Sequence, residues 1–300
     1  MSRAGINRRT RSRSIWRFSR LGAKVHLERH ILRRSADARI VAIAWPRDGG
    51  GFPDVLWSEV IPYVSDCWPD DYDRWTAKLQ RMKPRHIFVS ARDAAAVLQQ
   101  RLPRAAVHWL PEAIDPRQWD GSRPLAERSL DVLELGRHHT DYHNQIRGAL
   151  GPDVTHRFAS DGSRTPIFPG FAALRAGLAD SKIQVCFPKS MTHPDQAPDR
   201  GAGAKGLETV TQRYFEAIAS GSVIVGHSPA ELTDLFGYDP TIPADLERPV
   251  EQLHALLDDI ESCQDLVHRN LARLHEVGTW DVRVTKMLRI LGQDGYEVPK

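Results

Sequence analysis

The sequence predicts an α/β protein made of two Rossmann-like domains, each with a parallel sheet. Buried-type strands alternate with amphipathic helices along most of the chain, which is typical of parallel sheets covered by helices. The length of 300 residues exceeds what a single core usually organises. Residues 111–128 interrupt the alternation with three prolines and a glycine, and are expected to form a linker.

Apolar runs in the first half predict four strands and two helices. The strands are expected at residues 38–45, 61–66, 86–91 and 105–110. One helix is expected at 72–82, where Asp70 or Asp71 caps its start and Pro84 breaks its end, and the other at 92–100. These elements define an expected N-terminal domain over residues 38–127.

The second half repeats the alternation and defines an expected C-terminal domain over residues 128–279, followed by a last helix and tail at 280–300. Strands are expected at 129–136 and 182–188, and helices at 141–150, 170–179, 249–260, 262–275 and 280–292. Segment 189–207 is about nineteen residues long and lacks a regular pattern. Because it joins a strand end to a helix start, we expect it to border a ligand site.

The most informative stretch is Thr209–Gly226, which predicts a helix followed by a short buried strand. Gly221 is expected to end the helix in the left-handed conformation, and Val210, Tyr214 and Ile218 form a ridge expected to face the sheet. Arg213 and Glu216 are three residues apart and share one side of a helix. Glu208 precedes Glu216 by eight positions, roughly 80° away if the helix extends back that far. Both glutamates are then expected to reach one ligand.

These residues resemble a known nucleotide-sugar site. The Glu-x7-Glu arrangement followed by A-x-x-S-G-x-V-I-x-G resembles group 1 glycosyltransferases of the GT-B architecture, and R-x-F-E-A-x-A-x-G resembles bacterial spore-maturation-type glycosyltransferases. Other segments agree in order, and the resemblance covers roughly residues 55–292. They are D-x-W-P-x-x-Y-x-R-W at 66–75, HWLPEAID at 108–115, LELGR at 133–137 and TWDVRVTKML at 279–288.

The resemblance implies a metal-independent glycosyltransferase without a cofactor, acting on a nucleotide sugar and an unknown glycan, protein or lipid acceptor. Acceptor contacts are implied before about residue 127, and donor contacts after it. The implied catalytic residues are Arg213, which stabilises the leaving diphosphate with loop amides, and Glu208, which touches the sugar. Glu216 accepts hydrogen bonds from the ribose. The implied donor-binding set also includes Gly136, Arg137, Lys189, Thr211 and Tyr214. The glycine-rich loop usual in the first domain has only GGG at 49–51 as its counterpart, which also fits a shortened domain or lost activity.

Several residues have a second interpretation. Arg213 and Glu216 could form only a surface ion pair. His139 and His143 lie four apart in HHTDYH and, with Asp141 or an outside carboxylate, could bind zinc in a metal-dependent hydrolase, or they could line the donor cleft. Asp66 could be a general base or cap a turn, and Glu112 could be a general base or lie in a hinge.

Charge is concentrated at the start of the sequence. Residues 1–34 hold ten arginines and Lys24 against Glu28, which gives a net charge of +10. Because the whole chain has a net charge of +3, residues 35–300 carry −7. This basic arm, placed within residues 1–37, is expected either to bind anionic membrane or nucleic-acid phosphate, or to be a solvated leader. A non-catalytic GT-B-like binding protein that uses this arm is the alternative function.

Cysteine content and hydropathy suggest a compartment. Cys67, Cys186 and Cys263 are widely separated and odd in number, which favours a reducing environment over a disulfide framework. No apolar run approaches the ~20 residues that span a bilayer. We expect a cytoplasmic protein, with the basic arm allowing peripheral contact at the inner membrane face.

Overall fold

The computed structural model describes residues 38–46, 58–159, 166–195 and 202–297. The basic arm and the GGG at 49–51 lie outside the described residues. Contacts divide the chain into two compact units. Among the described residues, unit 1 runs to Pro111 and also includes Asp195 and 202–207, whereas unit 2 comprises Glu112–Pro194 and the chain from Glu208 onward. The division by contacts therefore falls after Pro111, and unit 1 is discontinuous in sequence.

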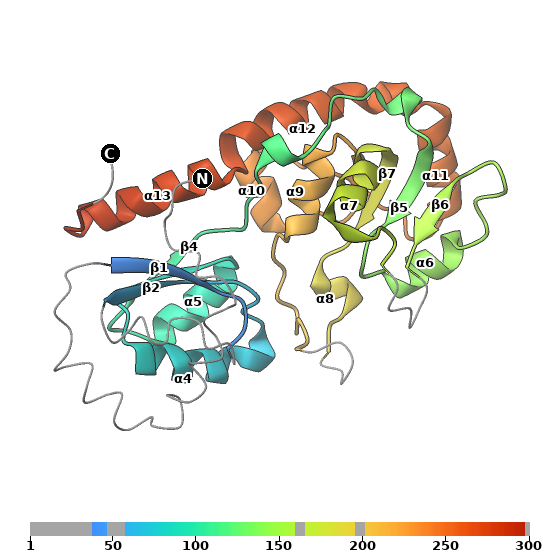
Figure 1. Cartoon of the computed structure of the whole chain (residues 1–300). Helices are drawn as coiled ribbons and strands as arrows, with labels where there is room; N and C mark the ends of the chain where they lie inside the picture. Colours follow the sequence, from blue (N-terminus) through green and yellow to red (C-terminus); the bar gives the residue numbers. More distant parts are fainter. Residues whose placement is uncertain (1–37, 47–57, 160–165, 196–201, 298–300) are drawn as a thin grey trace. The chain divides into compact units, whose positions relative to one another are not determined.

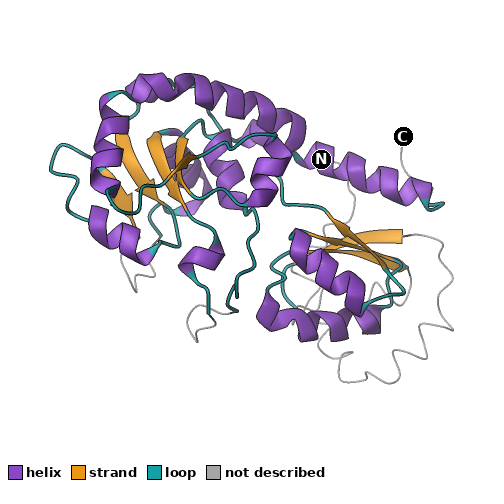
Figure 2. Cartoon of the chain, turned by 180° about the vertical axis from the view of Figure 1, so that it is seen from behind, coloured by secondary structure: helices purple, strands orange, loops and turns teal. Residues whose placement is uncertain are grey.

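Unit 1 has a parallel four-stranded sheet in the order β1-β2-β3-β4. Its strands are β1 (Ala38–Ile43), β2 (Glu59–Val64), β3 (His86–Val89) and β4 (Ala106–Trp109). After the short 3-10 helix η2 (Pro69–Asp71), helices α4 (Tyr72–Met82) and α5 (Arg92–Arg101) lie on the same side of the sheet in both views (Figures 1 and 2). The core between them also receives Ala204 and Leu207 from the second segment of the unit.

Unit 2 has a parallel five-stranded sheet in the order β6-β5-β7-β8-β9. Figure 1 labels β6, β5 and β7 of this sheet. The strands are β5 (Leu130–Glu134), β6 (His156–Phe158), β7 (Ser181–Cys186), β8 (Val223–Gly226) and β9 (Ile242–Pro243). The helices are α6 (Thr140–Ile146), α7 (Gly170–Ala179), α8 (Lys189–Thr192), α9 (Gln212–Ala219), α10 (Ala230–Phe236), α11 (Pro249–Asp258), α12 (Gln264–Val277) and α13 (Trp280–Gln293), and the 3-10 helices are η3 (Pro116–Gln118), η4 (Leu125–Glu127) and η5 (Ile260–Cys263).

Alternation along the unit 2 strands builds a core on each face of the sheet. On β8, Val223 and Val225 pack with α6, α11 and α12, whereas Ile224 points to the opposite face and packs with α9 and α10. Successive side chains of a strand point to opposite faces, so a continuous apolar run is the sequence of a strand covered on both sides. The predicted α/β class with parallel sheets is confirmed.

The predicted helix end at Gly221 is confirmed. Gly221 has φ +67°, and the amides of Gly221 and Ser222 donate to the carbonyls of Ile218 and Ala217, 2.9 and 3.1 Å away. This is the Schellman arrangement, which satisfies the last carbonyls of a helix. The predicted helix start was wrong, however, because α9 begins at Gln212 with Thr211 as its N-cap residue.

Several other boundaries differ from expectation. Residues 112–128, expected as a linker, pack within unit 2, where Ile114 and Leu125 are buried. The segment expected to lack regular structure begins with α8, and the short elements β6, β9 and α10 were not anticipated. Helix α6 ends at Ile146 rather than at 150. Asp71 precedes α4 but makes no side-chain cap; it pairs with Arg74 at 2.7 Å.

Two of the sequence motifs meet in unit 2. Ile114, from HWLPEAID, forms an isolated parallel bridge with Thr279, from TWDVRVTKML. The amide of Ile114 donates to the Gly278 carbonyl at 3.0 Å, and the amide of Trp280 donates to the Ile114 carbonyl at 3.1 Å. This bridge fixes the chain entering unit 2 against the start of α13.

The structure also describes the three cysteines and the apolar character of the helices. Cys67, Cys186 and Cys263 are buried free thiols. Burial raises the pKa of Cys186 to about 12, so this thiol is inert. Within the described part of the chain, no helix has both the length and the apolar composition needed to cross a bilayer.

Candidate functional site

The strand order of unit 2 locates a ligand site. From β5 the chain continues to β6 on one side and then to β7 on the other, so the order reverses between β5 and β7. Loops after the carboxyl ends of two such strands diverge and leave space for a ligand. The loop after β5 contains Gly136 and Arg137, and α8 follows β7 with Lys189 at its first position. Three predicted site residues therefore lie at the switch point.

Arg213 reaches this point from α9. Its Nη1 donates to the backbone carbonyl of Arg137 at 3.1 Å. Gly136 has φ +78°, and a methyl group there would lie 2.8 Å from Arg213 Nη2. Glycine thus serves two purposes, since it accepts the left-handed conformation and leaves room for the guanidinium. The structure brings Gly136, Arg137 and Arg213 together.

Glu216 lies one turn further along α9 and is half-buried. Among the described residues, no donor lies within hydrogen-bonding distance of its carboxylate, and it forms no ion pair with Arg213. Burial raises its pKa, and the charge of Arg213 offsets only part of that effect. The surface ion pair considered from the sequence is therefore not formed. A carboxylate kept partly desolvated without a partner is suited to accept hydrogen bonds from a ligand.

Glu208 is not on α9, in contrast to the helical geometry predicted from its spacing. It lies four residues before the helix, and its Oε1 is 3.0 Å from His227 Nε2. His227 directly follows β8, so Glu208 is held at the carboxyl end of that strand. Its side chain remains 32% exposed, which leaves it accessible to a ligand.

Two carboxylates accept hydrogen bonds from backbone amides at and just before the start of α9. Glu112 Oε2 accepts from the amide of Gln212 at 2.8 Å, and Glu231 Oε2 accepts from the amide of Val210 at 3.0 Å. The Thr209 hydroxyl also donates to Glu231 at 2.8 Å. A carboxylate satisfies the unpaired amides of a helix start and suits its positive end. These two amides are consequently engaged within the protein.

Two predicted donor contacts are buried. Tyr214 is fully buried, and its hydroxyl donates to the His227 carbonyl at 2.7 Å. It therefore packs in the core and supports His227 rather than facing a ligand, which corrects its expected role. Lys189 is 8% exposed at the first position of α8. Thr211, half-buried, offers no side-chain cap to α9.

Asp66 and Glu112, considered as general bases, have structural contacts. Asp66 follows β2 with φ +49°, and its Oδ1 accepts from the Trp68 indole at 3.2 Å. This is a turn residue of unit 1. Glu112 belongs to the start of unit 2, where its carboxylate caps α9.

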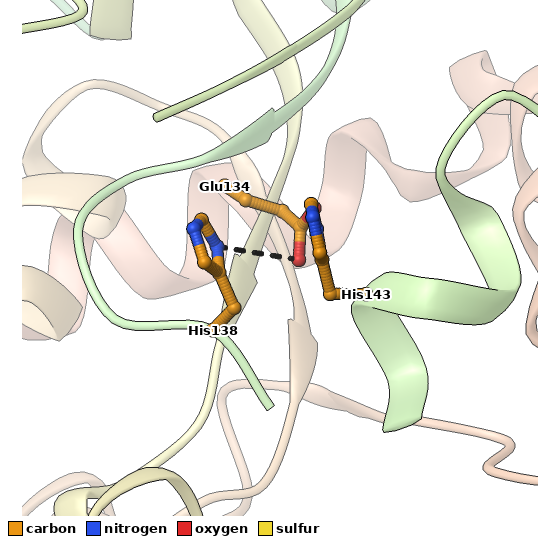
Figure 3. Close-up of side chains that lie close together, drawn as sticks. All are labelled: Glu134, His138 and His143. Carbon is orange, nitrogen blue, oxygen red and sulfur yellow. Dashed lines mark hydrogen bonds and ion pairs between the residues drawn. The ribbon is translucent and has the colours of Figure 1, made fainter. Parts of the chain in front are cut away.

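Three histidines lie around buried Glu134 at the end of β5: His143, which is buried, and His138 and His156, which are partly buried. Figure 3 shows Glu134 with His138 and His143. The His143 Nδ1 donates to Glu134 Oε2 at 2.6 Å, and the His156 Nε2 donates to the same oxygen at 3.0 Å. The His138 Nδ1 faces the other oxygen, Oε1, at 3.8 Å. Burial raises the pKa of Glu134, but the hydrogen bonds and charges of His156 and His143 outweigh it and lower the pKa overall.

This cluster differs from the zinc set considered from the sequence. His139 is the N-cap of α6, where its Nδ1 accepts from the Tyr142 amide at 3.3 Å. The expected pairing of His139 with His143 on one helix face was wrong because α6 starts only at Thr140. His138 stacks on His143 instead, with ring centroids 4.4 Å apart. Asp141 does not belong to the group of potential ligands, whereas Glu134 does.

The fold is shared with known enzymes. HepE of Anabaena in complex with UDP and glucose matches with a TM-score of 0.59 at 11% identity, covering 93% of this chain and 83% of that chain. Sucrose-phosphate synthase from Thermosynechococcus elongatus matches with a TM-score of 0.54 at 12% identity, covering 97% and 82%. These neighbours are GT-B glycosyltransferases. The chain has the GT-B fold.

A third neighbour is larger than this chain. The pneumococcal O-GlcNAc transferase GtfA in complex with UDP and GlcNAc matches with a TM-score of 0.53 at 12% identity, and the match covers 91% of this chain and 60% of that chain. No family model matches the sequence, and no curated protein matches it either. At these identities the likeness establishes the fold, and the function is argued from the site.

Sequence reasoning missed Glu134, His138 and His156 as one cluster, and Glu231 as the anchor of the segment before α9. The available signal was the position of Glu134 within an apolar strand, since a carboxylate buried there requires partners. His156 lies on a three-residue strand with no clear periodicity. Nothing in the sequence connected it to β5.

Proposed function

We propose that this protein is a glycosyltransferase of the bacterial spore-maturation type that transfers a sugar from a nucleotide-sugar donor held by unit 2. The observation that carries the proposal is the approach of Arg213 over Gly136 to the loop after β5, at the switch point of a parallel sheet. Half-buried Glu216 follows one turn later without a partner among the described residues. A cation and a carboxylate at this spacing match the two ends of a nucleoside diphosphate.

The chemistry requires positive charge where the donor breaks. As the glycosidic bond lengthens, negative charge develops on the nucleoside diphosphate, and preorganised cations lower the energy of that state. Arg213 supplies this charge, with Arg137 beside it. Glu216 accepts hydrogen bonds from the ribose hydroxyls, and Glu208, held by His227, contacts the sugar. Since Gln212 and Val210 have engaged amides, the guanidinium carries more of the phosphate binding than the start of α9 does.

The nucleotide to test first is UDP, because HepE and GtfA were both solved in complex with it. Isothermal titration of UDP and uridine into the protein, in buffer free of Mg²⁺ and Mn²⁺, measures the two affinities. We expect UDP to bind more tightly than uridine, and added Mg²⁺ to leave the affinity for UDP unchanged. A strict requirement for a divalent ion would contradict metal-independent binding of the diphosphate.

Catalysis is tested separately from binding. A panel of nucleotide sugars is screened by thermal shift, because a ligand that binds the native state stabilises it by RT ln(1 + [L]/Kd). Release of nucleoside diphosphate from the best donor is then followed with glycan, protein and lipid acceptors. Binding of a nucleotide sugar without release in the presence of any acceptor would favour the non-catalytic binding protein. No shift with any nucleotide or nucleotide sugar would refute the donor site.

A further inference from the structure

The cluster around Glu134 has the composition of a metal site. Glu134, His138 and His143 each offer one ligand atom, and these atoms lie within 4.8 Å of one another. His156 is outside this close group of three, but its Nε2 lies 3.0 Å from Glu134 Oε2, which makes it a candidate fourth donor. Three imidazole nitrogens and one carboxylate oxygen are ligands that Zn²⁺ accepts in a four-coordinate site. The four residues come from β5, the loop after it, α6 and β6.

The hydrogen bonds of the cluster leave one buried oxygen unsatisfied. Glu134 is 2% exposed, and its Oε2 accepts from both His143 and His156, whereas its Oε1 has no hydrogen-bond partner among the described residues. A buried carboxylate oxygen without a partner is costly. The His138 Nδ1 faces it at 3.8 Å, beyond hydrogen-bonding distance. A cation in contact with both atoms would satisfy the oxygen.

The outer contact of His138 fixes which of its nitrogens faces Glu134. Its Nε2 donates to the backbone carbonyl of Ala159 at 3.2 Å. A metal-binding histidine commonly donates its other ring N–H to a carbonyl or carboxylate, which sets the tautomer. In neutral His138 this bond places the proton on Nε2 and the lone pair on Nδ1. The lone pair is then directed toward the unsatisfied Glu134 oxygen, an arrangement of two acceptors that a cation stabilises.

Metal binding would change which ring nitrogens of the cluster carry protons. Glu134 Oε2 now accepts hydrogen bonds from His143 and His156. For each of these nitrogens to bind a metal, the proton that His143 Nδ1 or His156 Nε2 now donates to Glu134 would have to move to the other nitrogen of the same neutral ring, or, from an imidazolium, be released to solvent. The side chains of His138, His143 and His156 are 13%, 5% and 8% exposed. Such a closed site is typical of a structural metal rather than of one with an open position for substrate.

We propose that Glu134, His138, His143 and His156 bind a divalent transition-metal ion, with Zn²⁺ as the expected occupant. The ion would tie the loop after β5 to β6 and α6, and so hold the loop whose Arg137 carbonyl receives Arg213. Its part is to position that loop, and it does not contact the donor. The proposal stands independently of the glycosyltransferase assignment, because the ligands are complete without a nucleotide.

Metal uptake by the full chain tests the proposal without nucleotide or activity. The protein is stripped with a chelator, dialysed against ZnCl₂ and desalted, and its metal content is measured by atomic absorption. We expect stoichiometric zinc in the wild type and a higher melting temperature than in the stripped protein. His138→Ala and His156→Ala are expected to lose this zinc. His268→Ala, an exposed histidine on α12, serves as the matched control and should retain it.

Cobalt spectroscopy supplies a readout that loss of folding cannot imitate. Tetrahedral Co²⁺ absorbs strongly in the visible region, so the wild type with Co²⁺ should be intensely coloured. His138→Cys keeps a ligand atom and should add a thiolate-to-cobalt charge-transfer band that the wild type lacks, because none of the three buried native cysteines belongs to the ligand group. Absence of stoichiometric zinc in the wild type, or equal zinc in His138→Ala, would overturn the proposal. So would a weak octahedral cobalt spectrum.

Discussion

Replacement of Glu216 by glutamine should change stability and nucleotide affinity in opposite directions. The pKa of Glu216 is raised by burial, with only partial compensation from Arg213. A carboxyl group whose folded-state pKa lies above its unfolded value costs folding free energy once it ionises. This cost is absent below the unfolded pKa and is fully present above the folded one. Glu216→Gln should therefore be at least as stable as the wild type at pH 7, and the difference should vanish as pH falls below about 4.5.

The same substitution should weaken nucleotide binding. If ribose hydroxyls donate to the carboxylate, loss of the charge-assisted part of those bonds costs about 1.5–3 kcal/mol. The dissociation constant should then rise roughly tenfold to a hundredfold. Titration calorimetry with uridine and with UDP measures this loss, which should be similar for both ligands because the ribose is common to them.

The two measurements separate a ligand-binding role from a structural one. Urea denaturation of the free protein at pH 7 and at pH 4 gives the stability term. Glu251→Gln on α11, an exposed glutamate, is the matched control and should change neither quantity. A less stable Glu216→Gln with unchanged affinity would refute the reasoning, because it would show that the carboxylate supports the fold and binds no ribose.

Three further outcomes are expected. Arg213→Ala should weaken UDP more than uridine, since its partner is the diphosphate; equal losses by calorimetry would place the residue elsewhere. Gly136→Ala should destabilise unit 2 by about 1–2 kcal/mol in urea titrations, because an L-residue is forced into a left-handed conformation, and should also weaken UDP by displacing Arg213; a neutral effect on both would contradict the close approach. Deletion of residues 1–34 should leave the melting temperature unchanged but abolish salt-sensitive sedimentation with anionic vesicles, and undiminished sedimentation would show that these residues are a passive leader.

Local signals in the sequence predicted the fold well. Strand β8 and the end of α9 are determined by residues close in sequence, namely an apolar run and a glycine. Sequence pattern and conformational propensity therefore suffice to predict both. The same holds for Arg213 and Glu216, which the helix places on one side. The start of α9 depends on distant groups, because Glu112 caps it from a hundred residues away. The position of Glu208 off the helix could therefore not be predicted from its spacing.

The histidine cluster shows the same limit. Which histidine joins the cluster depends on where α6 begins. Because α6 begins at Thr140, His139 is its N-cap, and His138 is the residue that stacks on His143. The partner Glu134 ends β5, the strand just before the loop, whereas His156 lies on the short edge strand β6. Hydrophobic periodicity indicates which face of a helix or strand is buried. It does not indicate which distant segments come into contact in three dimensions.

The discontinuity of unit 1 has a consequence for synthesis on the ribosome. Ala204 and Leu207 complete the core of unit 1, and Asp70 accepts from the amide of Gly203 at 2.8 Å and pairs with Lys205. These partners are translated about a hundred residues after Pro111. At 5–20 residues per second, the nascent unit waits roughly 5 to 20 seconds with part of its apolar surface uncovered. During that interval it is a substrate for chaperones, and a recombinant fragment ending at Pro111 would retain the same exposed surface permanently.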